Sequence, residues 1–180
     1  MNNPKIIIDT DPGVDDAVAI MLLAKSGKVD IQAITTVAGN SNIQNTTANA
    51  EYLKDLLSLN CPIYSGATQS LTGPFIEGQV HGVTGLTGIT HSFQGNLTNN
   101  AVEKIIEIVN TFPNEITILL LGPQTNLALA IQKDPTLPSK IKQIVMMGGA
   151  VQSSGNKSWV AEFNIFLDPE AASIVFNTDT

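Results

Sequence analysis

The feature that most constrains the fold is a regular alternation of strand-like and helix-like segments along the chain. β-branched runs predict strands, and apolar residues at helical spacing predict helices between them. The predicted strands are 5–9, 31–37, 62–64, 115–121 and 143–147, and the predicted helices are 15–25, 43–59, 99–112, 125–133 and 168–177. Since parallel strands need connections long enough to hold a helix, this order predicts an α/β fold. We expect an open, mainly parallel sheet with helices on both faces and the first strand at its centre.

Local signals refine this outline, and no linker or internal repeat divides the chain. The segments 115–121 (EITILLL) and 143–147 (QIVMM) are apolar enough to predict buried strands. Ser41 is the predicted N-cap of the second helix, and Asp168 that of the last helix. The glycine-rich stretch 66–95 predicts a long loop, and loops of such length in compact domains are usually functional or disordered.

Composition excludes several classes of partner. The formal net charge of −7 disfavours binding to nucleic-acid phosphates. Charged residues make up only 14% of the chain, against about 25% in typical soluble domains, which fits a sheet covered on both faces. The single Cys61 fits a reducing compartment, and neither a secretory signal nor an apolar run of about 20 residues is present. We therefore expect a cytoplasmic protein that binds neither nucleic acid nor membrane.

Four carboxylates crowd the junction between the first predicted strand and the first predicted helix. Asp9, Asp11, Asp15 and Asp16 fall within the octapeptide DTDPGVDD. Two unit charges about 4 Å apart repel by about 4 kcal/mol at an effective dielectric near 20, so such a cluster protonates, spreads into solvent or holds a cation. Capping and turn-forming roles explain two or three of the acids, but not all four. We favour a metal site, and hard oxygen ligands indicate Ca²⁺ or Mg²⁺.

Further polar or small residues follow the other predicted strands. Asn40 comes after the second strand, while Gly122 and Gly148 follow the two apolar strands. The carboxyl ends of parallel strands meet at one edge of a sheet, where ligands bind. Glu162 and Asn164 stand among apolar neighbours, and in an extended segment their alternate spacing would turn both side chains the same way. If buried, this polar pair needs partners, which a ligand would supply.

Six segments resemble the nucleoside hydrolase family, in the family's order and spacing. They are DTDPGVDDAVAI (9–20), ITTVAGN (34–40), VHGVTGL (80–86), LLLGPQTNLALA (119–130), VMMGG (145–149) and VAEFNIFLDPEAA (160–172). The resemblance implies a Rossmann-like nucleoside hydrolase fold and hydrolysis of the N-glycosidic bond of ribonucleosides to free base and ribose. It implies a small-molecule ribonucleoside as partner and a role in nucleoside salvage, and we also expect a homo-oligomer.

The resemblance further implies a calcium site. Asp11 and Asp16 would ligate Ca²⁺ through their carboxylates, and the backbone carbonyl of Leu121 would be another ligand. Asp11 would also be the general base for a calcium-bound water, which attacks the anomeric carbon through an oxocarbenium-like transition state. Asp9 is expected to orient these ligands rather than to bind the ion.

A second implied group of residues surrounds the substrate. The predicted contacts to ribose hydroxyls are Asp15, Asn40, Glu162 and Asn164. Asn156 would lie near the 5′ end of the sugar, and Met147 beneath the ribose. His81 matches a histidine that lies near the base in relatives, so we predict that it helps to protonate the leaving base; a solvated loop histidine is the alternative. His91 has no predicted role.

Two alternatives to a complete nucleosidase remain. Family members carry a late His-Asp pair that this sequence lacks, so residues 1–180 are expected to form a single nucleoside hydrolase domain without its C-terminal part. Such a chain would be a catalytically impaired, metal- or ribose-binding fragment. The other alternative is a haloacid-dehalogenase-type phosphatase, with Asp9 as nucleophile, Asp11 as acid/base and Mg²⁺. Thr35 or Thr36 would be the Ser/Thr that this class of phosphatase needs at the end of its second strand. The further acidic pair that the class also needs does not follow in the sequence.

Overall fold

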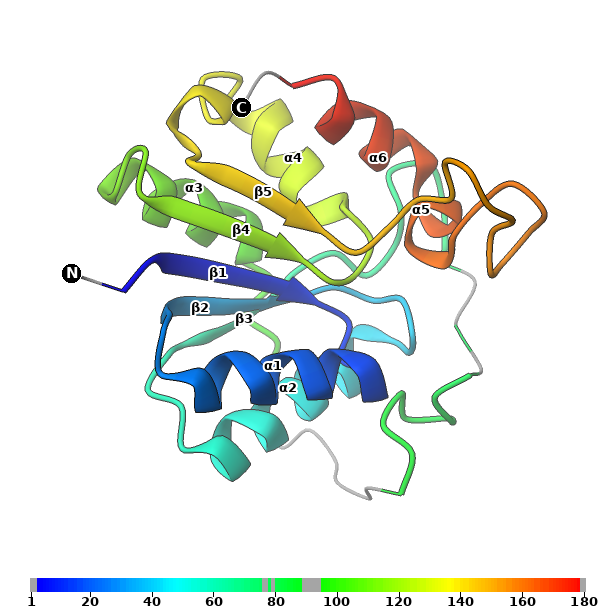
Figure 1. The fold of residues 1–180 in the computed structure, drawn as a ribbon, viewed down its shortest axis with the longest axis horizontal. Coiled ribbons are helices and arrows are strands. Elements are labelled where there is room, and N and C mark those ends of the chain that lie inside the picture. The colour runs from blue at the N-terminus through cyan, green and yellow to red at the C-terminus, as the bar shows by residue number, and fades with distance from the viewer. Residues whose placement is uncertain (1–2, 76–77, 79, 89–94, 179–180) are drawn as a thin grey trace.

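A five-stranded parallel sheet forms the centre of the molecule. The computed structural model describes residues 3–75, 78, 80–88 and 95–178, so His91 lies outside the described residues (Figure 1). The strand order is β3-β2-β1-β4-β5, and every neighbouring pair is parallel. The strands are β1 (Lys5–Thr10), β2 (Asp30–Thr36), β3 (Ile63–Ser65), β4 (Ile116–Leu120) and β5 (Gln143–Met146). The central position predicted for the first strand is confirmed.

Helices cover both faces of this sheet. They are α1 (Val14–Ser26), α2 (Ile43–Leu57), α3 (Ala101–Thr111), α4 (Thr125–Lys133), α5 (Phe163–Leu167) and α6 (Pro169–Phe176), with a 3₁₀ turn at Pro138–Lys140. Ile6 and Ile8 pack against α1 and α2, whereas Ile7 joins the core formed with α3, α4 and α6 (Figure 1). This division follows from the two-residue side-chain period of a strand. The predicted α/β fold is therefore confirmed. In the part of the chain that the structure describes, no helix is long and apolar enough to cross a membrane.

Three local predictions are wrong. Asn42, not Ser41, caps α2, because its side chain accepts a hydrogen bond from the Asn45 amide. The strand β5 is not buried, since it lies at an edge of the described sheet and its side chains alternate between exposed and half-buried. Glu162 and Asn164 do not share an extended segment: the Glu162 side chain caps α5, and Asn164 lies in its first turn. Glu162 accepts two amide hydrogen bonds there, which favours a helix start over a strand.

The strand order reverses beside β1, and this reversal positions the candidate site. The helix that follows β1 lies on one face of the sheet, while the helix that follows β4 lies on the other (Figure 1). Chains that leave neighbouring strands toward opposite faces open a crevice at the carboxyl ends of those strands, where ligands of α/β folds bind. The acid-rich segment 9–16 and the segment 121–124 both begin at this crevice.

Candidate active site

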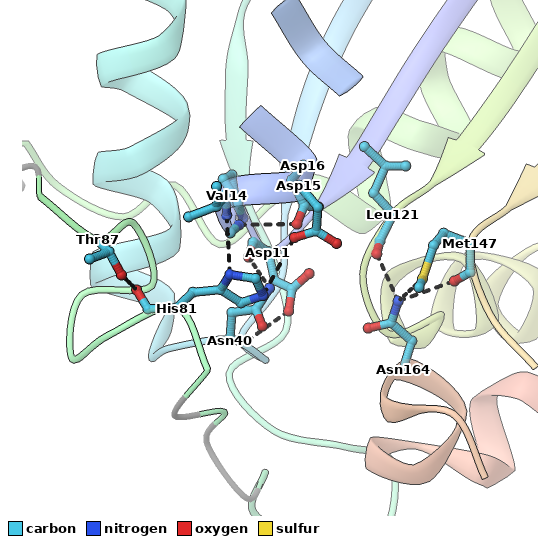
Figure 2. Close-up of polar contacts among 12 residues, drawn as sticks. Asp11, Val14, Asp15, Asp16, Asn40, His81, Thr87, Leu121, Met147 and Asn164 are labelled. Atoms are coloured by element: carbon cyan, nitrogen blue, oxygen red, sulfur yellow. Dashed lines mark hydrogen bonds and ion pairs between the residues drawn. The ribbon is translucent and has the colours of Figure 1, made fainter. Parts of the chain in front are cut away.

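A pocket of about 250 Å³ opens at the crevice between β1 and β4. Nine of the ten residues predicted for the site line it, and the tenth, Asp11, is wholly buried. The nine are Asp15, Asp16, Asn40, His81, Leu121, Met147, Asn156, Glu162 and Asn164. Figure 2 shows two groups of side chains facing each other, one around Asp11 and the other around Asn164. The fold thus brings together residues from five widely separated segments.

Asp11 is fixed by the backbone that surrounds it. Its Oδ2 accepts a hydrogen bond from the Asn40 amide at 2.7 Å, and the Asn40 side chain donates to the Asp11 carbonyl at 3.0 Å. Gly39 and Gly122 lie so close to the carboxylate that a larger residue would not fit at either position. A Cβ at Gly122 would lie only 2.7 Å from Asp11 Oδ1. Burial, followed by the charge of Asp16, raises the pKa of Asp11 well above its usual range, although the Asn40 amide opposes this shift.

Asp16 lies in the first turn of α1, and its carboxylate accepts hydrogen bonds from the preceding segment of the acid-rich loop. Oδ1 accepts from the Thr10 hydroxyl at 2.7 Å, and Oδ2 accepts from the Gly13 amide at 3.0 Å. The Gly13 contact supplies a partner for a backbone donor at the helix start. Burial raises the pKa of Asp16, while the bonds from Thr10 and Gly13 oppose this shift.

Asp9 lies in β1, two residues before Asp11, and is wholly buried. Its Oδ1 accepts from the Thr35 hydroxyl at 2.9 Å and from the Asn126 side chain at 2.8 Å. Its Oδ2 has no hydrogen-bond partner among the described residues. Burial raises the pKa of Asp9 to about 7, against the opposing effect of the Asn126 and Thr35 bonds. Asp9 is outside the pocket lining, and its orienting role stays a prediction.

The acid cluster fits part of a cation site. Asp11 Oδ1 is buried without a hydrogen-bond partner among the described residues, and an unpaired buried carboxylate oxygen is costly unless it meets a proton or a cation. The available donors are oxygen atoms, the type that Ca²⁺ prefers. However, the described residues contain no group of three or more acidic, histidine or cysteine side chains that could hold a metal ion. The donors therefore fit an oxygen-ligated cation but supply only part of its coordination shell.

The opposite wall of the pocket is held together by Asn164 (Figure 2). Its Nδ2 donates to the Leu121 carbonyl at 2.8 Å and to the Met147 carbonyl at 3.1 Å. These two carbonyls directly follow β4 and β5, so Asn164 ties the ends of both strands to α5. The Leu121 carbonyl that was predicted as a cation ligand thus has an amide partner already, and it has a second lone pair to offer.

Glu162 and Asn156 also use their side chains to hold backbone. Glu162 accepts from the amides of Asn164 and Ile165 at 2.9 and 3.2 Å. Asn156 Oδ1 accepts from the Phe163 amide at 2.8 Å. Both residues nevertheless line the pocket, so they can add a ligand contact to the ones they already make.

His81 meets the acid cluster from the loop that follows β3. Its Nε2 lies 3.4 Å from Asp15 Oδ1, and its Nδ1 accepts a long hydrogen bond of 3.4 Å from the Val14 amide (Figure 2). The His81 side chain is 21% exposed, whereas that of Asp15 is 65% exposed. The alternative of a fully solvated loop histidine is therefore wrong: His81 lies against the start of α1 and lines the pocket.

Sequence reasoning missed two buried asparagines that support the site. Asn49 donates to the Pro12 and Thr84 carbonyls at 2.9 and 2.8 Å, which ties α2 to the acid loop and to the loop that carries His81. Asn126 reaches from α4 to Asp9. Both lie on helices among apolar residues, and a carboxamide in such a position signals a buried hydrogen-bond network.

A larger groove of about 780 Å³ runs along α3 and α4, away from the acid cluster. Its lining includes the charged residues Glu103 and Lys133, which form an ion pair with each other at 2.5 Å. Because these charges are already paired, the groove presents no reactive group comparable to those of the smaller pocket. We assign the candidate chemistry to the smaller pocket.

Comparisons with known proteins identify the family of the chain. The sequence profile of the inosine-uridine preferring nucleoside hydrolase family matches residues 6–180. The chain is 42% identical to uridine nucleosidase 1 of Arabidopsis thaliana, covering 97% of this chain and 53% of that protein. It is 40% identical to the inosine-uridine preferring nucleoside hydrolase of Leishmania major, covering 96% of this chain and 57% of that protein.

Solved structures give the same result. A plant nucleoside hydrolase superposes with a TM-score of 0.91 at 42% identity, over 97% of this chain and 57% of that one. A purine-preferring ribonucleoside hydrolase from Gardnerella vaginalis superposes with a TM-score of 0.87 at 32% identity, over 96% and 57% of the two chains. The chain therefore spans a little over half the length of the relatives it matches. Its sequence, its fold and its acid-lined crevice together place this protein in the inosine-uridine preferring nucleoside hydrolase family.

Proposed function

We propose that this protein hydrolyses the N-glycosidic bond of ribonucleosides to free base and ribose. The observation that carries the proposal is the juxtaposition of buried acids on one wall of a small pocket with carboxylate and amide groups on the other, in a chain of this family. Relatives named for inosine and for uridine support these two nucleosides as the substrates to test first.

The ribose would bind between the two walls of the pocket. Carboxylate oxygens accept hydrogen bonds from sugar hydroxyls, and carboxamides both donate and accept them. The residues proposed for the sugar hydroxyls are Asp15, Asn40, Glu162 and Asn164, all of which line the pocket. Asn156 is proposed near the 5′ end of the sugar. Met147, which is 42% exposed beside β5, would supply an apolar surface beneath the ring.

A Ca²⁺ ion would be held by the carboxylates of Asp11 and Asp16 and by the carbonyl of Leu121. When bound, the ion would lower the pKa of a coordinated water and polarise the sugar hydroxyls. The unpaired Oδ1 of Asp11 and the oxygen-only donor set support this proposal. A test that does not depend on turnover is the rise in melting temperature on adding CaCl₂, since a ligand that binds only the folded state stabilises it.

Asp11 is the proposed general base. The Oδ1 of its carboxylate has no hydrogen-bond partner among the described residues, so this atom can accept a proton from the attacking water. The buried carboxylates would also favour the positive charge that develops on the sugar as the bond to the base breaks. His81 would donate a proton or a hydrogen bond to the leaving base, since it lines the pocket beside Asp15.

The experiment that tests the proposal is a hydrolysis assay on inosine and uridine, with added CaCl₂ or EDTA. We expect base release that depends on Ca²⁺ and is lost in Asp11→Ala. Hydrolysis of p-nitrophenyl phosphate tests the phosphatase alternative in the same preparation. Phosphate release without base release would overturn the proposal.

A second candidate is a chain that binds the cation and ribose but turns over slowly. It is favoured by the partial donor set, because Ca²⁺ affinity depends on the number and charge of its ligands. The two candidates differ in rate: the slow candidate predicts calcium binding with turnover far below that of the Leishmania major relative, assayed in parallel.

Location and assembly complete the proposal. We propose a cytoplasmic homo-oligomer that acts in nucleoside salvage. The buried, unpaired Cys61 supports a reducing compartment. The exposed apolar side chains of Val18 and Leu22 on α1 support burial against another polypeptide surface. Sedimentation of the purified protein measures the assembly state directly.

A further inference from the structure

Asn126 is a buried side chain that connects three separate segments next to the acid cluster. It lies in the first turn of α4, is wholly buried and is not part of the pocket lining. Its Nδ2 donates to Asp9 Oδ1 at 2.8 Å and to the Thr36 carbonyl at 3.0 Å. Its Oδ1 accepts from the Ala67 amide at 2.9 Å. The carboxamide thus ties α4 to the ends of β1 and β2 and to the loop that follows β3.

The neighbouring backbone leaves room for this carboxamide. A Cβ added at Gly66 would lie 2.7 Å from both Cγ and Nδ2 of Asn126. Real Cβ atoms do not approach so closely, so any larger residue at Gly66 would displace the Asn126 side chain. The absence of a side chain at Gly66 therefore lets the loop after β3 pass close to the Asn126 carboxamide.

The segments tied by Asn126 are those that hold the proposed cation ligands. The carbonyl of Asp9 accepts a hydrogen bond from the Leu121 amide at 2.8 Å, which aligns the end of β4 with the end of β1. Two residues after Asp9, the carboxylate of Asp11 accepts from the Asn40 amide, which follows β2. The relative position of β1, β2 and β4 thus sets where Asp11 lies relative to the Leu121 carbonyl.

We propose that Asn126 is a positioning residue for the acid site, which it serves by locking the ends of β1 and β2 to the β4–α4 turn. It acts through Asp9 and the strand ends and touches neither substrate nor cation. This inference rests on the proposed function only for its effect on calcium. Its direct structural consequence is that the hydrogen bond from the Asn40 amide to Asp11 depends on Asn126.

The test compares variants at Asn126 with a neighbour on the same helix. Asn126→Ser shortens the side chain, so that it no longer reaches Asp9 in β1 and the Thr36 carbonyl in β2. Asn126→Asp keeps the shape of the side chain but loses both N–H donors. The matched control is Thr125→Val, because the buried Thr125 hydroxyl bonds to Asp168 at 2.6 Å, away from the acid site. Amide hydrogen exchange at Asn40 and Leu121 is measured by NMR, and CaCl₂ affinity by titration calorimetry.

A positioning role predicts that both Asn126 variants lose at least tenfold in protection at the Asn40 amide, while Thr125→Val stays within twofold of wild type. It also predicts at least a tenfold loss of calcium affinity in the Asn126 variants alone. If Asn126→Asp fails to fold, Asn126→Ser carries the comparison, since its small side chain adds no charge beside Asp9. Unchanged Asn40 protection in a folded Asn126 variant overturns the inference.

The double substitution D9N/N126D sharpens the result, because it exchanges the amide and the carboxylate and so restores a donor–acceptor pair between the two positions. A positioning role predicts that this pair recovers part of the Asn40 protection lost in Asn126→Asp, and no recovery contradicts it. Failure of wild type to bind Ca²⁺ would count against the proposed function, whereas the amide-exchange comparison decides the role of Asn126 in either case.

Discussion

The two walls of the pocket satisfy their polar groups in opposite ways. On the β1 side, Asp9 and Asp11 lie outside the pocket lining and are at most 1% exposed, and each has a carboxylate oxygen without a partner among the described residues. On the wall that follows β4 and β5, Glu162 and Asn164 are also buried, but their side chains bond to backbone groups. The first wall therefore needs a proton or a cation, while the second is stable by itself and offers a preformed surface.

This difference assigns separate tasks to the two walls. An unpaired buried carboxylate is costly, so the first wall gains most from a bound ion. A side chain that already holds backbone is fixed in place, which suits the recognition of sugar hydroxyls. Substitutions on the first wall should therefore affect chemistry and cation binding, and those on the second should affect stability and substrate affinity.

The largest expected effect is a loss of turnover when an acid on the β1 side is replaced. Asp11→Ala should lower kcat for inosine or uridine by about 10²–10⁴-fold, the range for loss of a general base. Circular dichroism should show an intact fold, because the substitution removes a buried carboxylate that lacks a full set of partners. Nearly unchanged turnover in Asp11→Ala would remove Asp11 from the chemistry.

The next effect is a dependence of stability on pH in the metal-free protein. The folded pKa of Asp9 is about 7, above the usual 3.8, so the folded state holds its proton more tightly than the unfolded state. The resulting stabilisation is complete below about pH 3.8 and is lost as pH rises through 7, by up to about 4 kcal/mol. Urea unfolding in EDTA at several pH values measures it.

Asp9→Asn is the control for this pH effect, since it removes the titrating group but keeps the size of the side chain. Its unfolding free energy should vary less between pH 4 and 8 than that of wild type. A wild-type protein that gains stability over the same range would show that the acid wall is ionised and paired, contrary to the comparison above.

A smaller effect concerns stability on the second wall. Asn164→Leu should lower the free energy of unfolding by about 1–3 kcal/mol, because it leaves the Leu121 and Met147 carbonyls, whose bonds to Asn164 are partly buried, without their amide donor. Asn156→Ala removes one bond from an exposed residue and should cost less. Equal losses in the two variants, measured by urea unfolding, would show that Asn164 does not organise this wall.

The smallest effect is expected at His81, which bridges the acid wall and the loop after β3. His81→Ala should reduce kcat by about 10-fold or less and leave the melting temperature nearly unchanged, because its contact with Asp15 is long and solvent-accessible. If His81 protonates the leaving base, His81→Ala should slow the hydrolysis of a nucleoside with a poor leaving group more than that of one with an activated leaving group. Equal losses with the two substrates would restrict His81 to packing against α1.

The alternating strands and helices and the acid cluster could be predicted from the sequence. The strand and helix periods predicted the alternating elements, and the run from Thr125 to Lys133 matched α4 at both ends. The acids that follow Ile8 were conspicuous because four like charges in one short loop have few physical explanations. Residues placed by local chemistry were therefore predictable.

The errors arise where long-range contacts decide. Nothing local to Gln143–Met146 reveals that the strand lies at an edge, because its neighbours are set by the order of the whole sheet. The helix at Phe163–Leu167 begins at Glu162 because that side chain meets the amides of its own first turn, and alternate spacing alone resembles a strand. Asn126 finds its partners far along the chain, beyond the reach of any local pattern.

The acid wall following β1 is the proposed calcium site. Titration calorimetry of CaCl₂ into the metal-free protein at pH 8, for wild type and for Asp16→Asn, measures calcium binding there. We expect one Ca²⁺ per chain in wild type and at least a tenfold weaker affinity in Asp16→Asn, since that carboxylate is a proposed ligand. Absence of binding in wild type, or equal affinity in the two proteins, would contradict it.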